Sequence, residues 1–230
     1  MRRLTWAGRA FRAQPYAVQA IWISLWLAVG FAVWEGQWSL AFVALATFGA
    51  SLVPLVLVAR LGMRLPMPFI VGIVGFVYAT IFLGEAFDFY HRYPWWDVVM
   101  HGGSAIGFGL MGFLFVFLLF EGDRYAAPAW AMALIAFCVA VTIGAVWEIF
   151  EFGMDQLFGL NMQKSGLPDT MGDLIVDVIG GAFGALCGYL FLRGQELGGF
   201  TEVLGDFVMM NRARFRRLRG SRRRNRGPEG

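Results

Sequence analysis

Acidic side chains are concentrated at one end of several segments that are otherwise apolar enough to lie in a membrane. Nine of the sixteen acidic residues have this placement, with His101 among them: Glu85, Asp88, Asp97, Glu148, Glu151, Asp155, Asp169, Asp173 and Asp177. A carboxylate near the middle of a membrane helix costs about 2.5–3.5 kcal/mol on insertion scales. Its repetition at one end of the segments predicts a functional site.

Six of these residues form three pairs at helical spacing. Residues three or four positions apart lie on one face of a helix, and the pairs are Asp97/His101, Glu148/Glu151 and Asp173/Asp177. The pairs fall at similar depths in a path of six helices. If the three faces converge, their side chains surround one small volume.

Such a volume requires positive charge. Two carboxylates ~4 Å apart repel by about 4 kcal/mol at an effective dielectric of 20. Arg92 and Lys164 are the nearby basic side chains, and both lie in expected loops. Either several carboxylates hold protons or a cation lies between them. Carboxylates with one imidazole suit Mg²⁺, Mn²⁺, Fe²⁺ or Zn²⁺.

We therefore expect a divalent metal ion of unspecified identity. Its expected ligands are Asp97, His101, Glu148 and Asp173. Glu151 or Asp177 would act as a general base toward water. Structural roles compete with this assignment, because Thr170-x-x-Asp173 matches a capping box and Asp97 is placed to cap a helix.

Composition places the chain among membrane proteins. Hydrophobic residues make up 58% and charged residues 15%, whereas a soluble domain carries about 25% charge. The predicted fold is all-α, with about six transmembrane helices in a domain of residues 1–194, followed by an amphipathic, basic tail at 195–230. The expected spans are Tyr16–Trp34, Trp38–Val58, Met67–Phe87, Asp97–Phe120, Trp130–Gly153 and Met171–Leu192.

Basic residues predict the orientation. Arginines precede the first span, follow the second at Arg60 and Arg64, and follow the sixth at Arg193, so both termini are expected in the cytoplasm and the acidic ends outside. Nine arginines within Arg212–Arg226 predict contact of the tail with anionic lipids of a bacterial inner membrane. The tail carries no recognisable nucleic-acid-binding fold, so no nucleic-acid partner is expected.

Glycines recur every four residues in two predicted helices. Gly180, Gly184 and Gly188 form one row, and Gly103 and Gly107 form another. Small residues at this spacing let helix backbones approach closely. Packing within the chain is the expected use, and homodimerisation through these glycine-rich faces is the alternative.

The three motifs together resemble the YjdF family of bacterial inner-membrane proteins, a domain of unknown function. The resemblance covers roughly residues 85–184 and rests on Asp97-x3-His101, Glu148-x2-Glu151 and Asp169-Thr170-x2-Asp173. A more distant likeness is to VanZ-like proteins, although Glu148-x2-Glu151 replaces their Glu-x-x-Gln. The resemblance implies a multi-helix inner-membrane protein and supplies no reaction.

Three functions remain open from the sequence. The first is a periplasm-facing metal site, as in a hydrolase or transferase acting on a lipid-linked substrate. The second is an ion- or proton-coupled transporter, but charges are almost absent from the inner halves of the last four spans. The third is a structural or assembly subunit whose acids satisfy one another. Whether the chain is an enzyme is left open.

Overall fold

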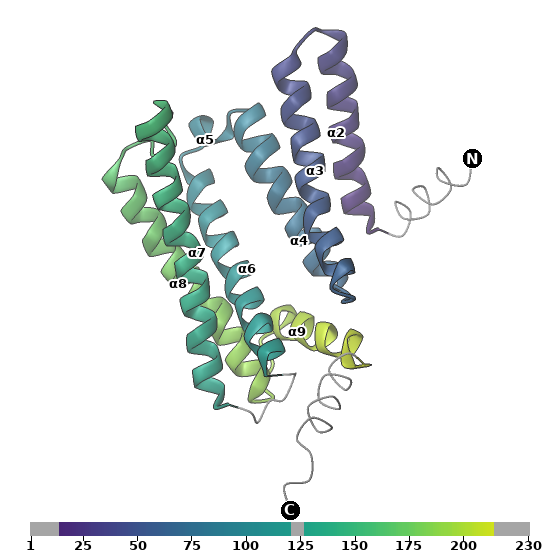
Figure 1. The fold of residues 1–230 in the computed structure, drawn as a ribbon, viewed down its shortest axis with the longest axis vertical. Coiled ribbons are helices and arrows are strands. Elements are labelled where there is room, and N and C mark those ends of the chain that lie inside the picture. Colours follow the sequence, from purple (N-terminus) through teal and green to yellow (C-terminus); the bar gives the residue numbers. More distant parts are fainter. Residues whose placement is uncertain (1–13, 121–126, 214–230) are drawn as a thin grey trace, which may run out of the picture. The chain divides into compact units, whose positions relative to one another are not determined.

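The computed structural model describes residues 14–120 and 127–213, and this part of the chain is helical (Figure 1). Six of its helical segments have the length and hydropathy of membrane spans: Tyr16–Trp34, Trp38–Arg60, Met67–Ala86, Trp95–Leu119, Ala129–Phe158 and Leu167–Leu192. At most 44% of any span's most apolar stretch is buried inside the protein, so most of each apolar surface faces outward. The all-α, multi-pass membrane architecture is thereby confirmed.

The chain divides into two compact units between Trp96 and Asp97. The first unit contains α2 (Tyr16–Trp34), α3 (Trp38–Arg60), α4 (Met67–Val77), the π-helix η1 (Tyr78–Ala86) and the short α5 (Phe89–Arg92). Its core is formed by the buried side chains Val18, Trp22, Leu25, Ala44, Val74 and Phe82. The Trp22 indole N–H donates a hydrogen bond to Ser51 Oγ at 3.0 Å, which ties α2 to α3.

The third span differs from the expected regular helix. The α-helical pattern stops at Val77, and the last nine residues of the span, Tyr78–Ala86, form a π-helix. Gly84 lies within it, and the Tyr90 ring occupies the space where a Cβ at Gly84 would lie, 2.3 Å from the nearest ring atom. The wider turn and this close approach are tertiary features that hydropathy does not report.

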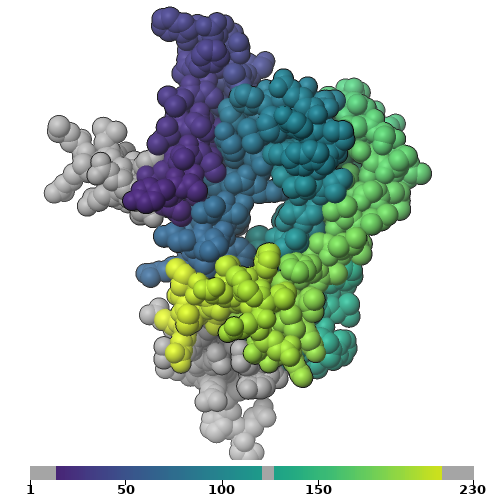
Figure 2. All heavy atoms as spheres, turned by 180° about the vertical axis from the view of Figure 1, so that it is seen from behind, coloured from purple at the N-terminus to yellow at the C-terminus, as the bar shows by residue number. Residues whose placement is uncertain are grey.

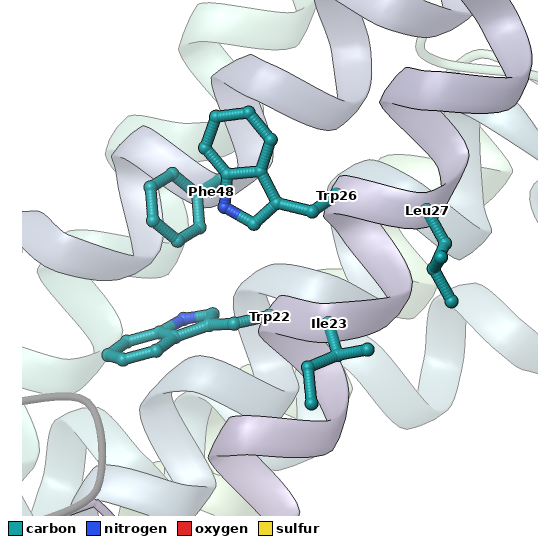
Figure 3. Close-up of a pocket in the computed structure, with 5 residues that line it drawn as sticks. All are labelled: Trp22, Ile23, Trp26, Leu27 and Phe48. Atoms are coloured by element: carbon teal, nitrogen blue, oxygen red, sulfur yellow. The ribbon is translucent and has the colours of Figure 1, made fainter. Parts of the chain in front are cut away.

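An apolar groove opens on the surface of this first unit (Figure 3). It is lined by Trp22, Ile23, Trp26, Leu27 and Phe48. The Trp26 and Phe48 rings meet edge to face at 5.4 Å. No lining residue carries a titratable side chain, so the groove offers none of the acid–base or ligand groups that the sequence analysis singled out.

The second unit contains α6 (Trp95–Leu119), α7 (Ala129–Phe158), α8 (Leu167–Leu192) and α9 (Gly199–Met210). α6 and α8 approach through glycine: a Cβ at Gly184 would lie 2.6 Å from the Ile106 carbonyl oxygen and 2.9 Å from Gly109 Cα. A Cβ at Gly180 would lie 2.9 Å from the Gly102 carbonyl oxygen, and one at Gly188 would lie 2.3 Å from the Phe113 ring. The α8 row of glycines is therefore used inside this chain, whereas among the described residues no neighbouring heavy atom lies within 4 Å of a Cβ built at Gly103 or Gly107.

α9 packs across the end of α8, as Figure 2 shows in yellow against light green. Leu204 and Phe207 on its apolar face are fully buried, and the Phe200 ring meets Phe183 of α8 edge to face at 5.3 Å. The predicted amphipathic helix is present, and Leu204 and Phe207 pack on the protein. The basic tail at 214–230 lies outside the described residues.

Replacing Gly184 with alanine should destabilise the second unit, because the added methyl group meets backbone atoms of α6. We expect a loss of about 1–3 kcal/mol, seen as a lower Tm of the purified protein in detergent. Gly107→Ala is the matched control, because its added methyl group meets no heavy atom within 4 Å. Equal Tm values for the two variants would contradict the close approach of α6 and α8.

Candidate functional site

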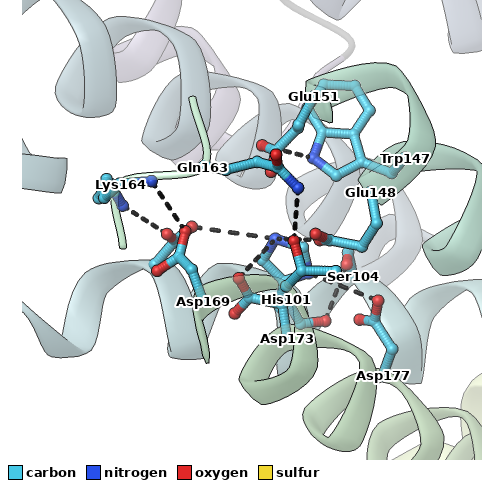
Figure 4. Close-up of polar contacts among 12 residues, drawn as sticks. His101, Ser104, Trp147, Glu148, Glu151, Gln163, Lys164, Asp169, Asp173 and Asp177 are labelled. Atoms are coloured by element: carbon cyan, nitrogen blue, oxygen red, sulfur yellow. Dashed lines mark hydrogen bonds and ion pairs between the residues drawn. The ribbon is translucent and has the colours of Figure 1, made fainter. Parts of the chain in front are cut away.

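Three helices bring acidic side chains together around one histidine in the second unit (Figure 4). Asp97 lies in the first turn of α6, with His101 one turn deeper. Glu148 comes from α7, and Asp173 and Asp177 come from α8. All of these side chains except Asp97 belong to buried residues, and Asp97 is partly buried. The buried cluster that the sequence predicted is present.

The two nitrogens of His101 face different partners. Nε2 lies 3.8 Å from Glu148 Oε1, 3.9 Å from Asp97 Oδ1 and 4.0 Å from Asp173 Oδ2. Nδ1 lies 3.4 Å from Asp177 Oδ2 on the other side of the ring. An Nδ1–H directed at Asp177 leaves the Nε2 lone pair of a neutral imidazole directed at three carboxylates.

Glu148 is buried without the partners that a buried carboxylate requires. The residue is 4% exposed, and neither carboxylate oxygen has a hydrogen-bond partner among the described residues. The Thr170 hydroxyl lies near the Glu148 carboxylate, but the two groups do not form a hydrogen bond. An unpaired buried charge is costly, so this group needs a cation or a proton as its companion.

Gly144 makes room for Asp177. A Cβ at Gly144 would lie 2.2 Å from Asp177 Oδ2, so the carboxylate of α8 occupies the space that a side chain on α7 would fill. Sequence analysis did not single out Gly144. The available signal was its position four residues before Glu148, which places both on one face of α7.

The loop between α7 and α8 places a positive charge on the cluster. Its Lys164 ammonium pairs with Asp97 Oδ2, and the Lys164 backbone N–H donates to Asp169 Oδ2 at 3.1 Å. Asp155, in the last turn of α7, accepts the backbone N–H groups of Met162 at 2.7 Å and Gln163 at 2.9 Å. Asp155, which lies beyond the expected end of this span at Gly153, therefore organises the loop that carries Lys164.

The capping box expected at Thr170-x-x-Asp173 is absent. α8 begins at Leu167, with Gly166 at its N-cap and no side-chain cap, so Asp169 and Thr170 lie inside the first turns. The Thr170 hydroxyl instead accepts a hydrogen bond from the Gln163 side chain at 2.6 Å. Pro168 near the helix start was the signal for the earlier beginning.

Four of the five carboxylates predicted for the site surround the His101 imidazole, and the fifth, Glu151, does not. Its Oε1 accepts a hydrogen bond at 3.0 Å from the indole N–H of Trp147, on the same helix. Glu151 belongs to neither of the groups whose ligand atoms lie within 4.8 Å of one another. Of the other acids singled out, Glu85 and Asp88 belong to the first unit, where Asp88 pairs with His91 at 2.6 Å.

The cluster carries more negative than positive charge. Glu148, Asp173 and Asp177 face one imidazole, while Asp97 is paired with Lys164. Carboxylates ~4 Å apart repel by about 4 kcal/mol at an effective dielectric of 20. An imidazole alone cannot balance three such groups. A bound cation or protons would complete the charge balance.

Comparison with known proteins identifies the family of this chain but assigns no reaction to it. Residues 15–194 match the model of the family described as "Predicted membrane protein (DUF2238)". An uncharacterised protein of Thermotoga maritima is 32% identical over 98 residues, which cover 43% of this chain and 50% of that protein. The chain thus spans about half the length of this relative.

No solved structure matches the chain. The YjdF name is not confirmed, although the matching family is of the same general kind. A family match over most of the length shows that the chain belongs to the predicted membrane protein family DUF2238.

Proposed function

We propose that this membrane protein binds a divalent cation between His101 Nε2, Glu148 and Asp173, with Asp97 beside them. The observation that carries the proposal is the buried Glu148 carboxylate. Both of its oxygens lack a hydrogen-bond partner among the described residues, and Oε1 faces the imidazole at 3.8 Å. An acidic cluster serving only packing would be expected to satisfy this group.

The donor set and its dimensions support an ion. One ligand atom from each of His101, Glu148 and Asp173 lies within 4.8 Å of the others. Ligands of a tetrahedral ion with bonds of about 2.0 Å lie about 3.3 Å apart, so contractions of about 0.5–0.7 Å bring the 3.8 Å and 4.0 Å pairs to that spacing. Imidazole with carboxylates suits Mn²⁺, Fe²⁺ or Zn²⁺.

The sequence makes Asp177 a candidate general base, whereas in this proposal it orients His101. It lies against Nδ1, on the side of the ring away from the other carboxylates. A carboxylate on the second nitrogen of a ligating histidine holds the ring orientation and raises the basicity of the ligating nitrogen. Asp177 is therefore a positioning residue. Glu151, outside the ligand groups, remains the candidate general base.

The depth of the cluster favours a lipid-linked substrate. His101 and Asp173 lie six residues from the starts of α6 and α8, or about 9 Å along each helix. That depth is close to the boundary between head groups and acyl chains. A divalent ion there would polarise an acyl or phosphoryl oxygen and activate water, as hydrolysis or group transfer requires.

Charge distribution favours a local site over an ion path. Beyond the cluster, α6 from Ala105, α7 before Glu148 and α8 from Val178 carry no acidic or basic residue. Arg193 follows the opposite end of α8. By the positive-inside rule, the cluster then faces the periplasm of a bacterial inner membrane.

Replacing Glu148 with glutamine should abolish high-affinity metal binding. The amide keeps the size of the carboxylate but removes the charge and one anionic ligand. Purified protein would be titrated with Mn²⁺ or Zn²⁺ after chelator treatment, and bound metal measured by elemental analysis. We expect about one ion per wild-type chain and less than a tenth of that occupancy in Glu148→Gln at the same free-metal concentration.

Glu202→Gln is the control, because Glu202 is an exposed acid in the first turn of α9. This variant should retain wild-type binding. Negligible metal in wild type, or identical occupancy in wild type and Glu148→Gln, would refute the ion site.

Replacing Gly144 with alanine should weaken metal binding, because its methyl group takes the space of Asp177 Oδ2 and displaces that carboxylate from His101. Loss of such an orienting group typically costs 10–100-fold in metal affinity. Isothermal titration calorimetry with Zn²⁺ would measure the change. Gly153→Ala, on the same helix with no heavy atom within 4 Å of the new Cβ, is the control.

A double-mutant cycle separates orientation from general destabilisation. In an Asp177→Ala background the space beside Gly144 is vacant, so adding Gly144→Ala should cause little further loss of affinity. Fully additive losses in the double variant would show that Gly144 does not act through Asp177.

A further inference from the structure

A second group of carboxylates lies beside the first and shares one residue with it. Oxygens of Asp97, Asp169 and Asp173 lie within 4.8 Å of one another, and Asp173 also belongs to the group with His101 and Glu148. The two groups differ in chemistry. The first includes an imidazole nitrogen, whereas the second offers only oxygens, the ligands preferred by Mg²⁺ and Mn²⁺.

The Asp173 carboxylate is buried where the two groups meet, and it forms no hydrogen bond with a described residue. Its side chain is 6% exposed, and its Oδ2 lies 4.0 Å from His101 Nε2. No described residue donates a hydrogen bond to it. A carboxylate has two oxygens and can bridge two ions, and Asp173 is the residue that belongs to both groups.

The Lys164 side chain, in the loop between α7 and α8, places a positive charge against the second group. The Lys164 ammonium contacts Asp97, while its backbone N–H is fixed to Asp169. Two backbone hydrogen bonds to Asp155 hold the preceding residues of the loop. The ammonium lies on a chain segment that is anchored through backbone groups, so the side chain can leave Asp97 without unfolding the loop.

We propose that Asp97, Asp169 and Asp173 form a second divalent-cation position, bridged to the first through Asp173, and that the Lys164 ammonium competes with the ion for Asp97. The inference rests on the proposed function, because Asp173 is shared with that site. With Lys164 in place, the second position carries one fewer uncompensated charge and binds its ion weakly. Withdrawal of Lys164 leaves three carboxylates for one divalent ion.

A two-ion state would suit one class of substrate. Two ions about 3.5–4 Å apart stabilise the attacking and leaving oxygens in reactions at phosphoryl groups. A lipid-linked phosphate ester therefore fits a two-ion state of this site. Lys164, an ammonium that pairs with oxyanions, would then be released from Asp97 beside the place where such a group binds.

Titration with Mn²⁺ tests the second position. Wild-type protein, Lys164→Met and Lys164→Arg would be purified in detergent, freed of metal, and titrated while bound Mn²⁺ is counted. We expect wild type and Lys164→Arg to bind one ion tightly. Lys164→Met should bind two, with the second ion bound about tenfold or more tighter than in wild type. Electron paramagnetic resonance of Lys164→Met should then show the spin-coupled signal of two nearby Mn²⁺ ions.

Lys164→Met/Asp169→Asn provides the matched control, because it removes a ligand of the second group and leaves His101 and Glu148 intact. It should return to one ion without a coupled signal. One tight ion in both wild type and Lys164→Met would overturn the second position while leaving the first in place. Absence of bound Mn²⁺ from all variants would instead overturn the proposed function and this inference together.

Discussion

Repulsion among buried carboxylates is a constraint that the second unit has to meet. Glu148, Asp173 and Asp177 converge on one imidazole, and all three are buried, so water cannot solvate them freely. The carboxylates of the cluster differ in how their negative charge is compensated. Asp177 faces His101 Nδ1, Asp97 pairs with Lys164, and Glu148 lacks a hydrogen-bond partner among the described residues. The lack of compensation at Glu148 distinguishes the cluster from a polar network that satisfies itself.

Helix packing makes the convergence possible. The glycine contacts between α6 and α8 bring backbones so close that a methyl group at Gly184 would meet the Ile106 carbonyl oxygen at 2.6 Å. Side chains one or two turns away on the same helices are then held within reach of each other. Gly144 does the same on α7, where the missing side chain leaves the space that Asp177 occupies. Lipid supplies no hydrophobic force between these spans, so close packing has to hold the charged faces together.

The α7–α8 loop supplies positive charge to the cluster. Asp155 fixes its backbone through Met162 and Gln163, and the loop in turn delivers Lys164 to Asp97. A lysine at this position contributes charge through a flexible side chain, which a divalent ion can replace. The same loop carries Gln163, whose side chain binds Thr170 on α8. Local order and charge compensation are therefore supplied by one short segment.

Local features were predictable from the sequence, because hydropathy and helical spacing act over short distances. The six spans were placed with small errors at most ends, although α7 continues five residues beyond the expected Gly153, to Phe158. The shared faces of Asp97 with His101 and of Asp173 with Asp177 also followed from spacing alone. The π-helix at Tyr78–Ala86 did not, since its residues are as apolar as those of an ordinary span.

The amino-acid sequence by itself determined a chain of membrane helices whose acids lie on a few helix faces. Only the tertiary structure decided that Asp177 and Glu148 lie on opposite sides of His101, that Glu151 lies outside the ligand groups, and that Gly144 makes room for a carboxylate. The physical reason is that ligand geometry depends on distances between residues far apart in the chain. Those distances are set by side-chain volume at the helix contacts, which no single helix encodes.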